Sequence, residues 1–247
     1  MAIAIHLAAV SGGNGRRRRF RWYAPGVIVV IGSPTALKKG KRIWPAGRSV
    51  TVADMAHAGG AEVQLVGKVG DDLAGDAIVI ELGRRGIGHS ALARSESGLT
   101  PSTTAPAEPD DEADTGEAAA AEAAAELAQT EPPLPGLALE AADVKLALGY
   151  LPEISTIVVA APLDEAAAKV VVDSAEYHEA SLIVLVEPGT KPAKAFGRSI
   201  VLQSPAGAGE VFDRLVGAFA ARIDGGAQPG DALRDVVASG GWERTAD

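Results

Sequence analysis

A three-layer α/β/α domain built around a largely parallel sheet is the fold class that this sequence of 247 residues predicts. Short β-branched runs alternate with segments of helical spacing, and this alternation is typical of parallel strands joined by right-handed crossover helices. Only 4% of the residues are aromatic although 47% are hydrophobic. The core must therefore consist mainly of aliphatic side chains, as in most buried parallel sheets.

The first half of the chain gives a strand, helix, strand, helix order. The unbroken run Val27 to Ile31 predicts a central strand that ends at Gly32-Ser33-Pro34. Ligands of open α/β sheets bind at the carboxyl ends of such strands. The elements expected next are a helix at 49–58 that stops at a Gly-Gly pair, a strand at 62–66 and a helix at about 73–85 that stops at Gly86.

The second half repeats the alternation in its own order. We expect helices near 139–148, at 163–178, near 208–223 and near 230–238, and strands at 156–160, 182–186 and 199–202. Together, residues 27–94 and 137–247 are predicted to form one α/β domain.

Two segments outside this domain differ in composition. Residues 1–26 carry five arginines and no acid, and we expect a basic, disordered tail. Residues 95–136 are rich in Pro, Thr, Ala and acids, and they contain too little apolar mass to offset the entropy of ordering. We expect an acidic, disordered insertion there.

Composition also excludes several classes of protein. The chain has no cysteine, which removes disulfides and thiolate metal sites and suits a cytoplasmic location. Its four histidines share no metal-ligand spacing, so we expect no metal site. No apolar run reaches the roughly 20 residues of a membrane helix, and the net charge of −9 leaves no basic stripe for nucleic acid. We therefore expect neither a membrane nor a nucleic-acid partner.

Two stretches carry a resemblance to a known family. Residues 46–51 read AGRSVT, residues 60–63 read GAEV, and residues 66–75 read VGKVGDDLAG. Near the C-terminus, residues 207–210 read GAGE and residues 216–221 read VGAFAA. Together these stretches resemble the ribokinase family, the PfkB-type carbohydrate and nucleoside kinases. The resemblance implies a ribokinase-like fold, shortened relative to the family, with its lid reduced or absent.

The resemblance also implies site residues. A Gly-Ala-Gly-Asp turn in the family forms an anion hole, and its Asp is the general base. The matching residues are Gly207, Ala208 and Gly209 for phosphate and Glu210 for catalysis, with three additional residues between this turn and the following helix. The positions on the substrate side are Gly32, Thr35, Gly47 and Thr51.

The departures from the family fall on the chemistry. An acid that would bind a sugar hydroxyl is replaced by Leu37, the Asn of the glycine-rich turn by Thr51, and the catalytic Asp by Glu210. The lid strands are not recognisable between Leu37 and Trp44, and the Asn-x-x-Glu motif of the family's metal and phosphate chemistry is not found.

The sequence thus predicts a pseudokinase that binds a sugar, a nucleotide or a partner. An active kinase that uses ATP and Mg²⁺ to phosphorylate a sugar or nucleoside is the alternative. A structural subunit with an exposed apolar patch is a third reading, and a homodimer is left open.

Overall fold

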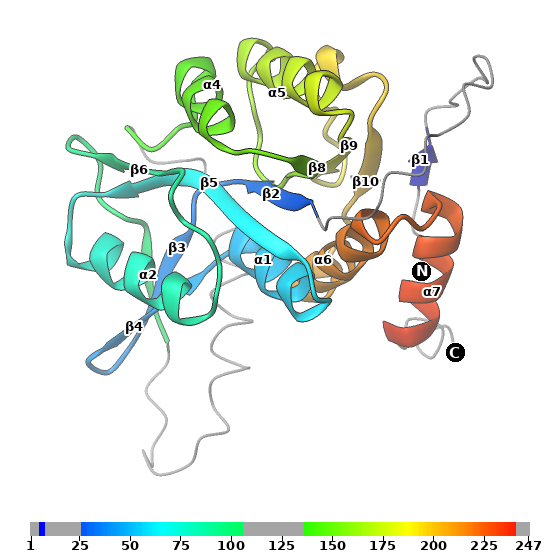
Figure 1. The fold of residues 1–247 in the computed structure, drawn as a ribbon. Coiled ribbons are helices and arrows are strands. Elements are labelled where there is room, and N and C mark those ends of the chain that lie inside the picture. Colours follow the sequence, from blue (N-terminus) through cyan, green and yellow to red (C-terminus); the bar gives the residue numbers. More distant parts are fainter. Residues whose placement is uncertain (1–4, 8–25, 106–135, 241–247) are drawn as a thin grey trace.

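A seven-stranded sheet forms the centre of the computed structural model, which describes residues 5–7, 26–105 and 136–240 (Figure 1). The strand order is β1-β10-β9-β8-β2-β5-β6. The six strands from β10 to β6 are mutually parallel, and β1 pairs antiparallel with β10. The strands are β1 (Ile5–Leu7), β2 (Val27–Ile31), β5 (Glu62–Gly70), β6 (Leu92–Ser95), β8 (Ile154–Val159), β9 (Ser181–Val186) and β10 (Ile200–Gln203).

Helices cover both faces of this sheet, as the sequence predicts (Figure 1). One face carries α4 (Ala141–Tyr150) and α5 (Glu165–His178), and the other carries α1 (Arg48–Ala58), α2 (Leu73–Arg84), α6 (Gly209–Asp224) and α7 (Pro229–Gly240). A short 3₁₀ helix, η1 (Lys194–Phe196), lies beside α5. The three-layer α/β/α architecture is confirmed.

Alternation along β2 explains why both faces can be covered. Its five residues are all buried. Val27, Val29 and Ile31 pack in the cluster that includes α4 and α5, whereas Ile28 and Val30 pack in the cluster that includes α1 and α6. Successive side chains of a strand point to opposite faces, so a continuous β-branched run suits a strand that is buried on both sides.

Part of the N-terminal segment is ordered. The structure corrects the expected disordered tail at one place, because Ile5 to Leu7 form the edge strand β1, which pairs with β10. Apolar residues at Ile5 and Leu7 suit a strand that extends a sheet. Residues 8–25 lie outside the described residues.

A second, smaller sheet lies beside the main one. Its order is β4-β3-β7, with β3 (Thr35–Lys39) and β4 (Arg42–Ala46) joined as an antiparallel hairpin and β7 (Ser102–Thr104) parallel to β3. The structure therefore has strands in the stretch between Leu37 and Trp44, where the sequence analysis recognises none. Basic residues and a proline within these strands obscure the period-2 pattern, and the two-residue turn is made possible by Gly40, whose φ is +57°.

The expected insertion begins later than residue 95. Ser95 ends β6, and β7 follows after a turn. Ala36 donates its backbone N–H to Pro101 O at 2.7 Å, and Ala105 donates to Lys38 O at 2.8 Å. Pairing with β3 orders this polar segment despite its composition. Residues 106–135, where the rest of the insertion is predicted, lie outside the described residues.

A close contact between α1 and α6 fixes the position of α6. A Cβ atom at Gly217 would lie 2.5 Å from Val52 O and 2.6 Å from Met55 Cβ. Only glycine permits this approach. Because α6 carries Glu210 and Asp213, this contact also determines where these two acidic side chains lie.

The Gly217→Ala variant should lose about 1–3 kcal/mol of unfolding free energy, since the added methyl group forces the two helices apart. Urea unfolding measures the loss. Gly149→Ala in α4 is the matched control, because a Cβ there meets nothing within 4 Å and a helical glycine-to-alanine change gains about 0.5–1 kcal/mol. Equal stability of Gly217→Ala and the parent would show that this contact does not set the helix position.

Candidate functional site

The candidate site lies at the carboxyl edge of the sheet, where three parallel strands end. Gly32 follows β2, Glu187 follows β9, and Ser204 follows β10. The helices α1 and α6 begin at this same edge, with Arg48 and Gly209. These are the places where the sequence predicts the substrate-side positions and the anion turn.

The Gly-Ala-Gly turn leads directly into α6, and Ala208 donates its backbone N–H to Pro205 O at 3.1 Å. Gly207 and Gly209 adopt φ of +73° and +43°, and a Cβ atom at either would meet nothing within 4 Å. Ala208 is the N-cap of the 16-residue α6 and supplies no side-chain cap. The N–H groups of a helix's first turn and its dipole favour an anion at such a position. The role in phosphate binding stays a prediction.

Glu210, the predicted base, points to a partner on its own helix. Its carboxylate accepts a hydrogen bond from Arg214 Nε at 2.8 Å and a second from the same guanidinium. The Glu210 side chain is 8% exposed, whereas that of Arg214 is 52% exposed. The catalytic role of Glu210 stays a prediction, and its carboxylate is engaged in an i,i+4 ion pair.

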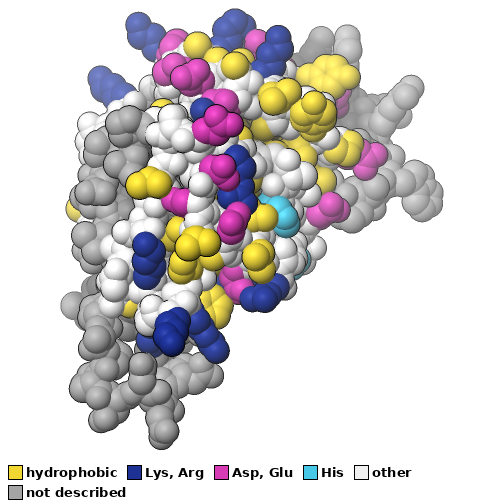
Figure 2. Space-filling view, turned by 90° about the vertical axis from the view of Figure 1, so that its left-hand side faces the viewer, with side chains coloured by type: hydrophobic (Ala, Val, Ile, Leu, Met, Phe, Trp, Pro, Cys, Tyr) yellow, Lys and Arg dark blue, Asp and Glu magenta, His cyan; other side chains and the backbone are white. Residues whose placement is uncertain are grey.

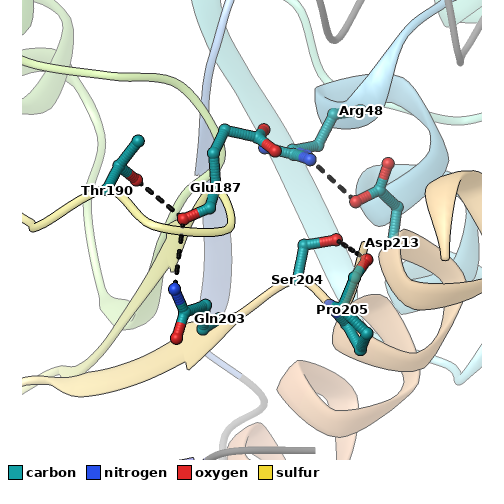
Figure 3. Close-up of polar contacts among 7 residues, drawn as sticks. All are labelled: Arg48, Glu187, Thr190, Gln203, Ser204, Pro205 and Asp213. Carbon is teal, nitrogen blue, oxygen red and sulfur yellow. Dashed lines mark hydrogen bonds and ion pairs between the residues drawn. The ribbon is translucent and has the colours of Figure 1, made fainter. Parts of the chain in front are cut away.

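A buried arginine joins α1 to α6 and to the end of β9 (Figure 3). Arg48, whose side chain is 10% exposed, donates from Nε to Asp213 Oδ1 at 3.0 Å and pairs through Nη1 with Glu187. The Asp213 side chain is fully buried. Thr190 Oγ1 and Gln203 Nε2 both donate to the Glu187 carbonyl, at 2.8 and 3.4 Å, and so fix the loop that carries this carboxylate.

The environment of Asp213 favours its neutral form. Burial raises its pKa to about 6, although the charge and hydrogen bond of Arg48 act in the opposite direction. The negative charges of Glu187 and Glu210 raise the pKa further. Asp213 therefore titrates close to neutral pH, which is a property of many functional carboxylates.

Asp213 also occupies an informative position along α6. The turn and the VGAF helix are separated by three residues more than in the family, and three residues are nearly one helical turn. If the position is counted back from Gly217 with the family's spacing, the acid falls at Asp213 rather than at Glu210. Since Gly217 is fixed against α1, Asp213 is the acid that lies level with Arg48.

The substrate-side positions come together around the start of α1. Gly47 adopts φ +95°, and a Cβ atom there would lie 3.1 Å from Thr35 Oγ1. A Cβ atom at Gly32 would lie 3.0 Å from Ser49 Cβ. Thr51 lies one turn along α1 and donates its N–H to Gly47 O at 3.1 Å. The positive φ of Gly47 and the tight contact at Gly32 account for both glycines, so their presence does not by itself indicate a ligand.

Asp72, the second acid of the VGKVGDDLAG motif, serves the fold. Asp72 is the N-cap of α2 and accepts hydrogen bonds from Gly75 N at 2.7 Å, Thr100 N at 2.8 Å and Thr100 Oγ1 at 2.7 Å. Burial alone would raise the pKa of Asp72, but these bonds to the charged form outweigh it and lower the pKa. Within the described residues no three His, Cys, Asp or Glu side chains gather as metal ligands would.

Comparison with known proteins identifies the fold. Neither a family model nor a curated protein matches the sequence. Solved structures do: a putative ribokinase II from E. coli in complex with ATP and Mg²⁺ (TM-score 0.53, 13% identity, 87% of this chain and 91% of that chain), phosphofructokinase-2 from Escherichia coli in its tetrameric inhibited form (0.58, 15%, 87% and 93%), and Arabidopsis thaliana ribokinase with ribose and ATP (0.52, 12%, 87% and 91%).

These similarities define the class: the chain has the ribokinase-like carbohydrate-kinase fold. At such low identity they establish the fold alone. Among the residues that the structure describes, no helix is both long and apolar enough to cross a membrane.

Sequence reasoning missed Arg48, Glu187 and Asp213. Signals for two of them were available. Glu187 directly follows a buried strand, and the three additional residues before the VGAF helix mark the displacement that brings Asp213 to the site. Arg48 follows Gly47, which has a positive φ, but this glycine gives no indication of which residues the Arg48 side chain contacts.

The linkage of Asp213 to folding can be measured. In the folded state the pKa of Asp213 is about 6, above the ordinary value of 3.8, so the folded protein binds a proton more tightly than the unfolded chain. The contribution of Asp213 to the free energy of unfolding therefore falls as the pH rises from about 4 to 6. Two pKa units correspond to roughly 3 kcal/mol. Relative to Asp213→Asn, the parent should lose about that much unfolding free energy between pH 4 and pH 7 in denaturant titrations. Parallel pH profiles for the two proteins would refute the linkage.

Proposed function

We propose that this chain is a degenerate ribokinase-like protein, a pseudokinase, which binds a sugar or nucleotide ligand or a partner without efficient phosphoryl transfer. One observation carries the proposal: each of the two acids that could accept a proton from a substrate hydroxyl is already paired with an arginine. Asp213 pairs with Arg48, and Glu210 pairs with Arg214.

Geometry limits what these carboxylates can do. A general base must come within about 2.6–3.2 Å of the group that it deprotonates. Arg48 Nε stands at 3.0 Å from Asp213 Oδ1, and the Asp213 side chain has no exposure to a ligand. Arg214 Nε stands at 2.8 Å from Glu210. A substrate hydroxyl would have to approach a carboxylate that an arginine already holds in place, and misplacement by about 1 Å can cost on the order of 100-fold in rate.

The fit to ATP and Mg²⁺ differs between the two groups. The N-terminus of α6 at the turn 207–209 suits a phosphate, and a structural neighbour is described in complex with ATP and Mg²⁺. Mg²⁺ that accompanies a nucleotide takes most of its ligands from phosphates and water, so it would come with ATP rather than occupy a site of its own. ATP, when bound, would supply the phosphoryl group, and this chain's contribution would be to hold its phosphates at the start of α6.

A second candidate is an active ATP-dependent kinase for a sugar or nucleoside. The pKa of about 6 favours it, because a carboxyl that titrates near neutral pH is a competent proton acceptor. In that case Asp213 competes with Glu210 for the role of base.

The hypothesis of a structural subunit receives less support. On the face shown in Figure 2, acidic and basic side chains are interspersed and the apolar side chains form small groups. Cytoplasmic location and a homodimer stay predictions.

A coupled ADP-release screen tests the proposal. With ATP, Mg²⁺ and a panel of sugars and nucleosides, we expect no rate above the ATP-only background, because each acid is held in an ion pair with an arginine. Isothermal titration of the same panel should still detect binding of a sugar or nucleotide.

Two variants make the screen diagnostic. If a substrate turns over and Asp213→Asn or Glu210→Gln abolishes that turnover while leaving the protein folded, the pseudokinase proposal is wrong and the variant identifies the base. If turnover survives both changes, a contaminating kinase must be removed before the rate is assigned to this chain.

A further inference from the structure

Four basic residues lie together at the turn of the β3–β4 hairpin, and we call them the basic tip. They are Lys38 and Lys39 at the end of β3, Lys41 in the turn, and Arg42 at the start of β4. Lys41 and Arg42 are exposed, and the other two are half-buried. Lys39 and Arg42 stand directly opposite each other in the register of the hairpin. Like charges in this position repel each other, so an acid brought to the tip would relieve the repulsion.

The described part of the protein supplies no counter-charge to the basic tip. None of the ion pairs among the described residues includes one of its four side chains. Two acids on helices that contact β4, Asp54 of α1 and Glu81 of α2, pair with Arg85 instead. In Figure 2, Lys and Arg side chains gather at the lower end of the face, at the height of the β3–β4 hairpin in Figure 1.

The sequence provides acids directly beside the basic tip. Strand β7 runs parallel to β3 and ends opposite Lys38, and Ala105 donates its backbone N–H to Lys38 O at 2.8 Å. The chain therefore leaves the second sheet next to the tip. Residues 106–114 read PAEPDDEAD, with five acids and no basic residue. We call residues 108–114 the acidic stretch.

Chain length brings the acidic stretch within reach of the basic tip. An extended chain advances at most about 3.3–3.6 Å per residue, so Glu108 can lie up to about 10 Å and Asp114 up to about 30 Å from Ala105. The tip extends only four residues beyond Lys38, and these residues fold back in the turn. A tether this short holds the two groups of charges at an effective concentration in the millimolar range.

Charge favours the chain's own acids over an external polyanion. An exposed ion pair contributes little by itself and is weakened by salt, but several charges in one network contribute more. The acidic stretch offers five acids to the four cations of the tip. A nucleic acid or an anionic membrane would have to compete with these tethered acids, and the net charge of −9 repels it.

We propose that the basic tip is the docking surface of the acidic stretch of the same chain. The docked acids neutralise Lys39 and Arg42 where these face each other, and they cover the tip against anionic polymers. The proposal is independent of the pseudokinase proposal, because neither the tip nor the stretch contains a residue of the candidate site.

Two sets of substitutions with the same change in net charge test the docking in the full chain. The near set is Glu108→Gln, Asp110→Asn, Asp111→Asn and Glu112→Gln. The far set is the matched control and neutralises four acids further along the sequence: Glu117→Gln, Glu122→Gln, Glu126→Gln and Glu131→Gln. A third set, Lys39→Gln, Lys41→Gln and Arg42→Gln, removes the tip charges. Circular dichroism checks that each variant is folded.

Contact is measured by coupling with a zero-length carbodiimide, which joins a lysine amine to a carboxylate only when the two touch. Mass spectrometry should find Lys39 and Lys41 joined to acids of the stretch, and more rarely to the four acids of the far set. At about 1 M salt the screening length falls to about 3 Å, so the yield should drop about tenfold.

Exposure of the tip is measured by fluorescence anisotropy with a labelled oligonucleotide of thymidine as the anionic polymer. The near set should bind it about tenfold more tightly than the far set, although the two variants have equal net charge. Adding the third set to the near set should remove this gain. The arginines at 16–21 are present in every variant, so their contribution cancels.

Four outcomes would overturn the inference. Equal affinity of the near and far sets would show that the stretch does not cover the tip. Binding of the oligonucleotide by the parent as tightly as by the near set would assign the tip to a nucleic acid. Coupling that is insensitive to salt, or as frequent with the far acids, would leave only random contact. Coupling between isotopically labelled and unlabelled copies alone would make a second copy the occupant.

Discussion

The contact of Gly217 with α1 is the constraint on which the site depends. Since no side chain larger than hydrogen fits between α6 and the backbone at Val52, the rotation and height of α6 are set there rather than at its first turn. The contact at Gly217 therefore sets the positions of the residues between it and the start of α6. Asp213 therefore lies level with Arg48, and the glycine turn lies about one helical turn further from the contact.

About one helical turn more separates the glycine turn from Gly217 here than in the family that the sequence resembles. The glycine turn lies at the start of α6, while the buried Asp213 lies further along the helix and is held by Arg48. An arginine that bridges Asp213 and Glu187 supplies a counter-charge to the buried Asp213 carboxylate and to the partly exposed Glu187 carboxylate. Removing Arg48 would therefore disturb both the fold and the site.

Much of the architecture could be predicted from the sequence because its signals are local. A β-branched run such as β2, or a helix that ends at Gly59 or near Gly86, can be predicted from a few consecutive residues. The small strands β1, β6 and β7 are not predicted because their pairing is non-local: β7 contains Ser and Thr residues that only acquire a strand conformation against β3. The β3–β4 hairpin is local, but basic residues and a proline obscure its alternating pattern. In the site, the glycine turn was visible as a motif. The Arg48 cluster was not, because its members come from three distant segments that only the tertiary fold brings together.

The antiparallel strand β1 has a consequence for how copies of this chain can meet. A parallel sheet ends at each side with a row of unpaired backbone groups, which can recruit a strand from another molecule. Residues 5–7 pair with that row along β10 and so become the edge of the sheet themselves. This edge strand is only three residues long, and short edge strands are one means by which proteins limit pairing between sheets of different molecules. A chain trimmed before Val27 would leave the edge of β10 uncovered instead.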